Sequence, residues 1–253
     1  MAKQIDIAQD PSLLNGSSYL HLMDPRLKVL ASFILALSVA LTRDWGSLVL
    51  LLGLSTLLVF WSRIPLTKVI RRLAAFDSVL IILWLTLPFS AGGEKVYLGG
   101  VAIYAEGIKL ALAITLRSNA AFLGFLALLG TTPIHENLKA LRALGIPHKL
   151  VLLLHFTYRY GHVLMQEAIK VQQAMALRGF QPGFNLFTMK TYGNFVGVIF
   201  LKAFKRAERV TQAMVLRGFE GTFPELAAPK RMSFKEVASC AVLCLLFWGC
   251  TLV

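Results

Sequence analysis

The sequence of 253 residues is 57% hydrophobic, has a mean hydropathy of +0.67 and contains only 15% charged residues. This composition excludes an ordinary soluble domain and is typical of membrane proteins. The net charge of +13 suits either nucleic-acid binding or membrane insertion. Residues 131–233 hold 14 of the 26 Lys and Arg residues against five acids. We interpret this segment as the cytoplasmic side of a membrane protein, and we predict no nucleic-acid partner.

Five apolar runs organise most of the chain. Residues 1–23 form a polar arm, in which Met1–Asp10 lacks the apolar core of a signal peptide. Asp24 and Pro25 then predict a helix start, because Asp is a good N-cap and Pro suits the first helical position. A helix from Pro25 to Thr42 would be about 27 Å long, close to the thickness of a bilayer core. The predicted transmembrane runs are Leu27–Thr42, Gly46–Ser62, Leu73–Ser90, Gly107–Gly130 and Phe234–Val253.

The loops between the runs differ in charge. Residues 63–72 form a basic loop, and residues 91–106 form a glycine-rich loop with room for a small turn or hairpin. Within residues 131–233 no clean apolar stretch reaches transmembrane length. The pattern there predicts amphipathic helices over Ile134–Leu144, His148–Leu177 and Phe187–Phe204, the last followed by a further helix that ends at Leu216.

These elements predict an all-α integral membrane protein with about five transmembrane helices. The arm and four helices occupy residues 1–130, a cytoplasmic domain of amphipathic helices occupies 131–233, and the last helix occupies 234–253. With a cytoplasmic N-terminus, only Arg43 and Lys95 lie outside. A rival topology counts Leu150–Met165 and Phe187–Leu201 as two further spans. We prefer five spans because the rival places two matching segments on opposite sides of the membrane.

The matching segments are the most informative feature of the sequence. Gln173–Phe180 reads QAMALRGF, and Gln212–Phe219, 39 residues later, reads QAMVLRGF. Each closes a polar helical run at a glycine, which favours the left-handed conformation of a helix C-terminus. The arginine is expected in the last helical turn, where a cation suits the helix dipole. Ordinary C-capping explains each Arg-Gly pair, but the matching residues around it favour two contacts with the same kind of partner.

Arg117 is the most unusual residue of the fourth run. It lies about 15 Å into the run, near the bilayer centre, where a charge is expensive and indicates function or pairing. Asp77 in the third run is one expected partner, although it lies roughly 9 Å nearer the cytoplasm. Alternatively, the polar run that includes Asn119 faces another membrane subunit.

No catalytic or metal-binding constellation is predicted. His148, His155 and His162 recur every seven residues, so each step along one helix rises about 10.5 Å, too far for the three to chelate one ion. The sequence has no phosphate-binding loop of the Gly-rich Lys-Ser/Thr type. We therefore expect no cofactor in this chain.

The paired Leu-Arg-Gly segments resemble the T component of energy-coupling factor (ECF) transporters. The segment Asp24-Pro25-Arg26-Leu27-Lys28 and the Tyr158-Arg159-Tyr160 run are similar to that family as well. The residues Tyr19-Leu20-His21 before Asp24 look most like CbiQ, the cobalt-transport member. The family more often shows Ala-Arg-Gly or Ala-x-x-Arg-Gly. Two residues before the arginine this chain has Ala176 in the first copy and Val215 in the second, so the second copy departs slightly from the pattern.

The resemblance implies a coupling scaffold in the bacterial inner membrane, with its partners in the membrane and the cytoplasm. Those partners would be two cytoplasmic ATPase subunits that bind the ATP, and a CbiM-like substrate-binding membrane subunit with a CbiN-like small subunit. It implies cobalt(II) uptake and hence a link to cobalamin biosynthesis. The expected ATPase contacts are Ala176, Leu177, Arg178, Gly179, Val215, Leu216, Arg217 and Gly218; the expected intramembrane contacts are Arg117, Asn119 and Asp77; the family motif is Asp24, Pro25 and Arg26.

Three alternatives remain open. Nickel uptake would use the same scaffold. An integral-membrane metal-dependent enzyme would use the histidines with Glu136 or Glu167. A conventional ABC permease would transport with ATPases alone, without a separate substrate subunit.

Overall fold

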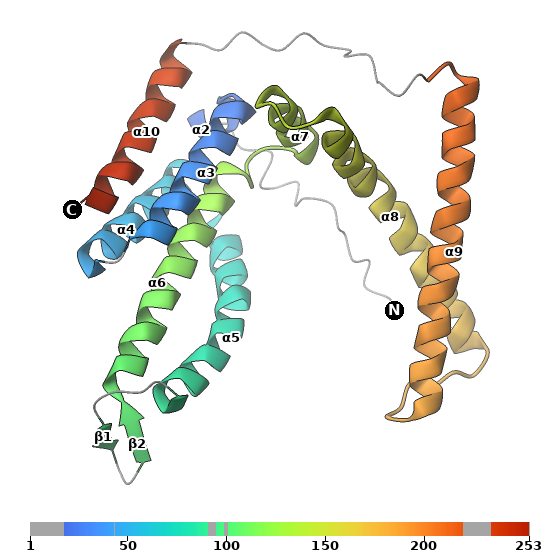
Figure 1. Ribbon diagram of the computed structural model, residues 1–253, viewed down its shortest axis with the longest axis horizontal. Helices are drawn as coiled ribbons and strands as arrows, with labels where there is room; N and C mark the ends of the chain where they lie inside the picture. The colour runs from blue at the N-terminus through green and yellow to red at the C-terminus, as the bar shows by residue number, and fades with distance from the viewer. Residues whose placement is uncertain (1–17, 43, 91–94, 99–100, 220–233, 253) are drawn as a thin grey trace. The chain divides into compact units, whose positions relative to one another are not determined.

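The computed structural model describes residues 18–42, 44–90, 95–98, 101–219 and 234–252 (Figure 1). The expectations for the N-terminal arm before Ser18, for Arg43 and for the linker 220–233 therefore lie outside the described residues. The chain divides into two compact units. Unit 1 comprises Met1–His148 and Met232–Val253, and unit 2 comprises Lys149–Arg231.

Unit 1 begins with α2 (Tyr19–Leu22) and α3 (Pro25–Leu41). The predicted start of α3 is confirmed: the Asp24 carboxylate accepts a 2.9 Å hydrogen bond from the Arg26 amide, and Pro25 occupies the first turn. The same face of α3 is buried along its length, through Lys28, Ala31, Ser32, Leu35, Ser38 and Val39.

The core of unit 1 forms where α3, α4 (Trp45–Trp61), α6 (Ala105–Leu128) and α10 (Phe234–Leu252) meet. Helix α4 packs closely along α6, and α10 packs along α3. Small side chains allow these close approaches. The fully buried residues at the centre include Leu35, Leu51, Leu58, Ala127 and Phe247.

Helix α5 (Leu66–Ser90) starts seven residues before the predicted apolar run. The expectation of a basic loop over 63–72 is therefore wrong for Lys68, Arg71 and Arg72, which lie in the first two turns of the helix. An apolar run marks only the hydrophobic part of a helix, and charged residues continue it without a break. Helix α5 packs on α6, where the rings of Phe76 and Phe122 stack 4.8 Å apart.

A small antiparallel hairpin joins α5 to α6. Its strands are β1 (Lys95–Leu98) and β2 (Val101–Tyr104), with Lys95 opposite Tyr104 and Leu98 opposite Val101. The described residues are otherwise helical or in short turns, so the predicted helical class is confirmed with the hairpin as its one sheet.

Unit 1 also holds α7 (Ile134–Ala143), which packs against α3. Helix α8 (His148–Leu177) has the predicted bounds. Helix α9 (Leu186–Leu216) is one continuous helix of 31 residues, where the sequence suggested two consecutive pieces. No Pro or Gly interrupts it after Gly197, so the helix runs on to the second glycine stop.

Two of the described helices, α5 and α6, are long and apolar enough to cross a membrane. Trp45–Trp61 and Glu236–Cys250 are apolar but shorter. Many large apolar side chains of α5 are exposed, among them Val79, Ile81, Ile82 and Leu85 at 64–68%. Such a surface suits lipid or another membrane helix.

Candidate functional site

The first arginine end, Gln173–Phe180, closes α8 with a Schellman motif. The Phe180 amide donates to the Met175 carbonyl at 3.1 Å, and the Gly179 amide donates to the Ala176 carbonyl at 3.0 Å. Gly179 has φ +78°, the left-handed conformation that this motif needs. The helical residues end at Leu177, so Arg178 is the capping residue just beyond the last turn, where it remains close to the negative end of the helix dipole.

The second arginine end, Gln212–Phe219, repeats this geometry at the end of α9. The Phe219 amide donates to the Met214 carbonyl at 3.0 Å, and the Gly218 amide donates to the Val215 carbonyl at 2.9 Å. Gly218 has φ +76° and Arg217 is the C-cap. The expectation that each arginine lies in the last helical turn is therefore corrected by one position in both copies.

All eight residues expected at the contact are exposed. Leu177 is 90% exposed and Leu216 is 88% exposed. Among the described residues, neither the Arg178 nor the Arg217 side chain has a hydrogen-bond or ion-pair partner. Each end thus presents an exposed leucine beside a guanidinium that has no partner among the described residues.

The two arginine ends lie at opposite ends of α9. The ring of Phe180 packs against Phe187 at 6.4 Å and against Tyr192 at 5.8 Å, so the first end rests on the start of α9. Arg217 caps the other end. From Tyr192 to Arg217 the helix rises roughly 37 Å. A single partner domain contacts both ends only if it spans that distance, whereas two partners can each take one end.

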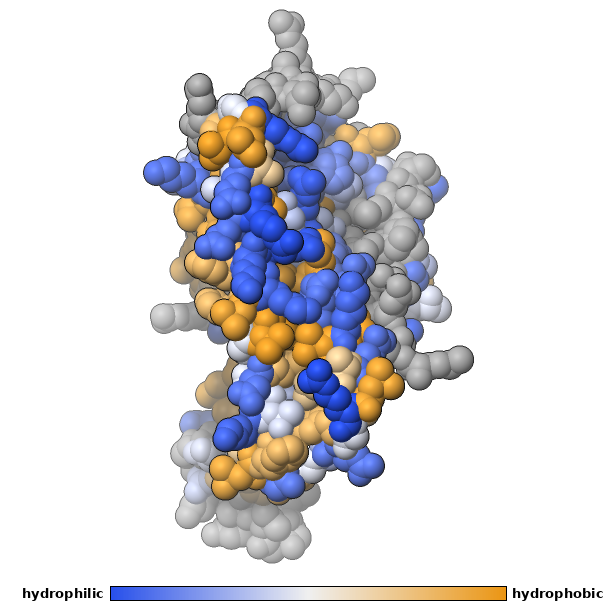
Figure 2. Space-filling view, turned by 90° about the vertical axis from the view of Figure 1, so that its right-hand side faces the viewer, coloured by the Kyte–Doolittle hydropathy of each residue, from blue (hydrophilic) through white to orange (hydrophobic). Residues whose placement is uncertain are grey.

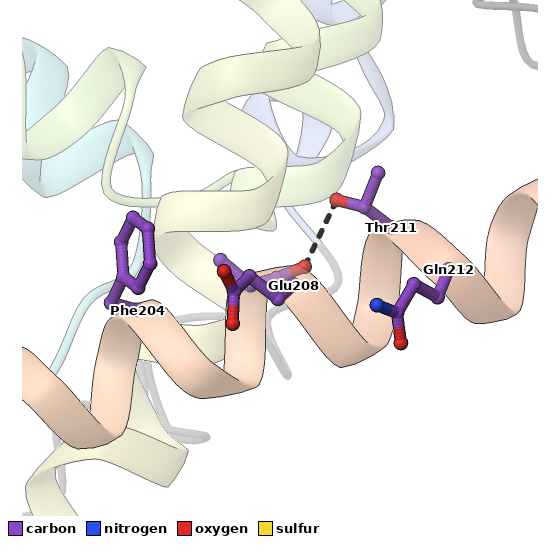
Figure 3. Close-up of a pocket in the computed structure, with 5 residues that line it drawn as sticks. Phe204, Glu208, Thr211 and Gln212 are labelled. Carbon is purple, nitrogen blue, oxygen red and sulfur yellow. Dashed lines mark hydrogen bonds between the residues drawn. The ribbon is translucent and has the colours of Figure 1, made fainter.

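Two hollows lie beside these ends in unit 2. A hollow of about 190 Å³ beside the first end is lined by Gln172, Met175, Ala176, Phe180, Pro182, Tyr192 and Phe195. A shallower one of about 340 Å³ follows successive turns of α9 before the second end, along Phe204, Ala207, Glu208, Thr211 and Gln212 (Figure 3). The face drawn in Figure 2 shows hydrophilic side chains in a band next to hydrophobic patches, as amphipathic helices produce.

Glu167 links α8 to α9. Its carboxylate accepts 2.9 Å and 3.3 Å hydrogen bonds from the ammonium groups of Lys202 on α9 and Lys170 on α8. These bonds, the one from Lys202 foremost, hold the pKa of Glu167 below its usual value. The sequence offered no indication of this pair, because its partners are 35 residues apart.

Arg117 does not pair with Asp77 in the structure. It donates a 2.5 Å hydrogen bond to the carbonyl of Thr42, at the C-terminal end of α3. Trp84 donates to Thr115 at 3.0 Å and Phe76 stacks on Phe122, so position 117 is level with about position 81 of α5. Asp77 is therefore displaced by roughly 6 Å along the helix.

Asp77 and Asn119 each keep a buried oxygen, and Arg117 a buried Nε, that has no hydrogen-bond partner among the described residues. The structure thus places Asp77 on α5 and Arg117 and Asn119 on α6 without joining them, and the guanidinium of Arg117 contacts the end of α3 instead. The partner of Arg117 was missed because the level at which α3 ends beside α6 depends on how the helices pack and cannot be read from the sequence.

The family motif forms a junction in unit 1. Asp24 caps α3, and Lys28, one turn later, is completely buried with its ammonium 2.8 Å from the hydroxyl of Thr132. The predicted site residues did not include Lys28. Its spacing from Ala31, Ser32 and Leu35 places it on the buried stripe of α3, which is the pattern that could have identified it.

The histidines on α8 do not converge. Within the described residues, no group of three or more His, Cys, Asp or Glu side chains lies close enough to hold a metal ion. The His162 ring packs edge-on to Tyr158 at 5.4 Å, and His155 packs against Phe156 at 6.2 Å. Both histidine rings therefore contact aromatic neighbours on α8.

The described residues define a helical membrane protein that presents two matching, exposed arginine ends. Comparison with known families identifies it further. The family described as CbiQ, cobalt transport protein, matches residues 16–227, and the chain belongs to this family of T components of ECF transporters.

Several curated relatives carry the name energy-coupling factor transporter transmembrane protein EcfT. The relative from Listeria innocua is 32% identical over 205 residues, which cover 76% of this chain and 77% of the relative. That from Bacillus subtilis is 29% identical over 214 residues, 77% of this chain and 78% of the relative. That from Ruminiclostridium cellulolyticum is 28% identical over 221 residues, 83% and 82%. The resemblance drawn from the sequence is confirmed.

Proposed function

We propose that this protein is the coupling scaffold of an ATP-driven importer and that its two arginine ends each dock on one cytoplasmic ATPase subunit. The observation that carries the proposal is the repeated geometry: two matching Schellman ends at opposite ends of α9, each with an exposed leucine and with an arginine that has no partner among the described residues. An arginine fits this role because its guanidinium can form two parallel bonds to a carboxylate or to carbonyl groups of a partner.

The chain itself is proposed to be non-catalytic. Its sequence lacks a Gly-rich phosphate loop, so ATP would be bound by the partner subunits. The substrate would be bound by a separate membrane subunit, CbiM-like with a CbiN-like small subunit, for which Asp77 on α5 and Arg117 and Asn119 on α6 are the proposed intramembrane contacts. The family description of cobalt transport supports cobalt(II) as the substrate, with nickel as the second candidate.

The proposed topology has five spans, α3, α4, α5, α6 and α10, in the inner membrane of a bacterium with the N-terminus in the cytoplasm. The charge of residues 131–233 supports a cytoplasmic coupling domain there. Both arginine ends then face the same compartment as the ATPase subunits.

Co-purification with the ATPase subunits in detergent tests the proposal. We expect Arg178→Glu and Arg217→Glu each to lower ATPase retention by roughly tenfold or more, as for other interface hot spots, and the double variant to abolish it. Arg209→Glu is the matched control, because it reverses the charge of an exposed arginine on α9 that lies eight residues before Arg217. A double variant that inserts normally and still holds both ATPases would disprove the docking role.

A further inference from the structure

The most completely buried long side chain among the described residues is that of a lysine. Lys28 is 0% exposed, in the second turn of α3. Its ammonium donates a 2.8 Å hydrogen bond to the Thr132 hydroxyl, and Thr132 is itself 1% exposed. Asp24 and Glu136 are near enough to attract the ammonium electrostatically. A buried, charged side chain therefore links the start of the first long helix to a residue 104 positions later.

Thr132 belongs to the tight connection between α6 and α7. The Gly130 amide donates to the Phe125 carbonyl at 3.2 Å, and the Thr131 hydroxyl donates to the Ala127 carbonyl at 3.0 Å. From α7, the Asn137 amide group donates to the carbonyls of Leu129 and Thr132, both at 3.4 Å. The connection is thus held from both of its helices, and Lys28 adds a third attachment from α3.

The position of this connection decides where α7 begins. Helix α7 packs on α3 and is followed, after Leu144–Pro147, by α8, whose far end carries Arg178. The α6–α7 connection therefore lies in the part of unit 1 from which the chain leads, through one short helix and a four-residue link, into the helix that ends at Arg178.

Stability alone does not require a lysine at this position. Removing an ammonium group from water is costly, and buried charges can often be replaced by apolar side chains of similar size at no loss of stability. What an apolar side chain cannot provide is a directional bond to one acceptor. A buried charge that adds little stability but selects one arrangement is best explained by a positioning role.

We infer that Lys28 is a positioning residue that locks the α6–α7 connection onto α3 and so transmits motion between the membrane helices and the coupling helices. This inference rests on the proposed coupling function. Lys28→Met would keep the length and apolar stem of the side chain while removing the bond, so the protein would still fold and bind ATPases but would couple poorly.

The test uses the full complex of this chain with its ATPase and substrate subunits, reconstituted in proteoliposomes. For Lys28→Met we expect unchanged ATPase retention, amide hydrogen exchange in residues 129–143 faster by about tenfold, and cobalt(II) uptake per ATP hydrolysed lower by about tenfold. Lys139→Met, at an exposed lysine on α7, is the matched control and should change neither the hydrogen exchange nor the uptake per ATP. Unchanged exchange in residues 129–143, or unchanged uptake per ATP, would overturn the inference.

Thr132→Val keeps the test decisive if Lys28→Met fails to insert. It replaces the acceptor hydroxyl by a methyl group of similar size and is expected to raise exchange in the same segment; no rise would equally overturn the inference. The double variant should be no worse than the more severe single variant, because both single variants break the Lys28–Thr132 bond. Loss of ATPase retention belongs to the arginine-end variants, so failure of the docking proposal and failure of this one give different results.

Discussion

At the residue scale, the glycines of the arginine ends have a conformational role that glycines inside the helices do not share. Gly179 has φ +78°, which costs roughly 1–2 kcal/mol for a residue with a β-carbon. Gly161, in the middle of α8, has open space where a β-carbon would stand. Alanine there should stabilise the helix by about 1 kcal/mol.

We therefore predict effects of opposite sign for two chemically identical changes. Gly179→Ala should lower the Tm of the detergent-solubilised protein and weaken ATPase retention, whereas Gly161→Ala should raise the Tm. Gly179→Asn should lie between wild type and Gly179→Ala, because Asn tolerates the left-handed region. Equal effects of alanine at the two positions would show that the Schellman geometry does not matter in solution.

Arg117 permits a second prediction at this scale. Its bond to the Thr42 carbonyl is charge-assisted and part-buried, so Arg117→Leu should destabilise the protein by about 2 kcal/mol. Since no bond joins Arg117 to Asp77, the effects of Arg117→Leu and Asp77→Asn on the free energy of unfolding should add within about 0.5 kcal/mol. A double-mutant cycle in detergent measures the coupling energy between the two positions. A coupling energy well above about 0.5 kcal/mol would show that Arg117 and Asp77 form the ion pair suggested by the sequence.

At the scale of elements, the Glu167–Lys202 bond is the described ion pair that joins α8 to α9. We predict that Lys202→Glu lets the two helices separate and that the exchange Glu167→Lys with Lys202→Glu restores their spacing. Spin labels at Gln173 and Gln212, the matching exposed positions of the two ends, report the distance once Cys240, Cys244 and Cys250 are replaced. Lys190→Glu, at an exposed lysine of α9, is the control.

The same pair predicts a dependence on pH. The pKa of Glu167 is lowered from 4.5 in the folded protein by the bond from Lys202 and then by Lys170. Its contribution is therefore fully present above pH 4.5 and is lost as the pH falls through the lowered value. The distribution of distances between the labels should stay constant from neutral pH down to pH 4.5 and broaden only below that pH. Broadening between pH 6 and 7 would point to another group.

Most elements could be predicted because their patterns are local. The Asp24-Pro25 start and the Leu-Arg-Gly stops each specify a helix boundary within a few residues, and α8 was predicted with both bounds. The start of α5 was missed because cationic residues are good helix formers that an apolar count ignores.

The contacts of Lys28, Glu167 and Arg117 could not be predicted in the same way. The bonded partners are 104 residues apart for Lys28, 35 for Glu167 and 75 for Arg117. Only the packing of whole helices decides which of these distant side chains meet. The eight residues of the arginine ends could be grouped from the sequence because the repeat is itself local; their role as ATPase contacts stays a prediction.

At the scale of the whole molecule, the docking proposal depends on both arginine ends lying in the cytoplasm. Five spans place residue 181, between α8 and α9, on the same side as residue 67 at the start of α5. Seven spans place residue 181 on the opposite side, together with the hairpin. The two topologies therefore differ at one short loop that an impermeant label can reach.

We predict that Gln181→Cys, in a background with Cys240, Cys244 and Cys250 replaced by alanine, reacts with an impermeant maleimide only after the cell membrane is permeabilised. Thr67→Cys serves as the internal reference and Leu98→Cys, in β1, as the external one. Reaction of Gln181→Cys in intact spheroplasts at the rate of Leu98→Cys would place Arg178 and Arg217 on opposite faces of the membrane. Since cytoplasmic ATPases could then contact only one arginine end, that single result would end the two-ATPase proposal, whatever the geometry the two ends share.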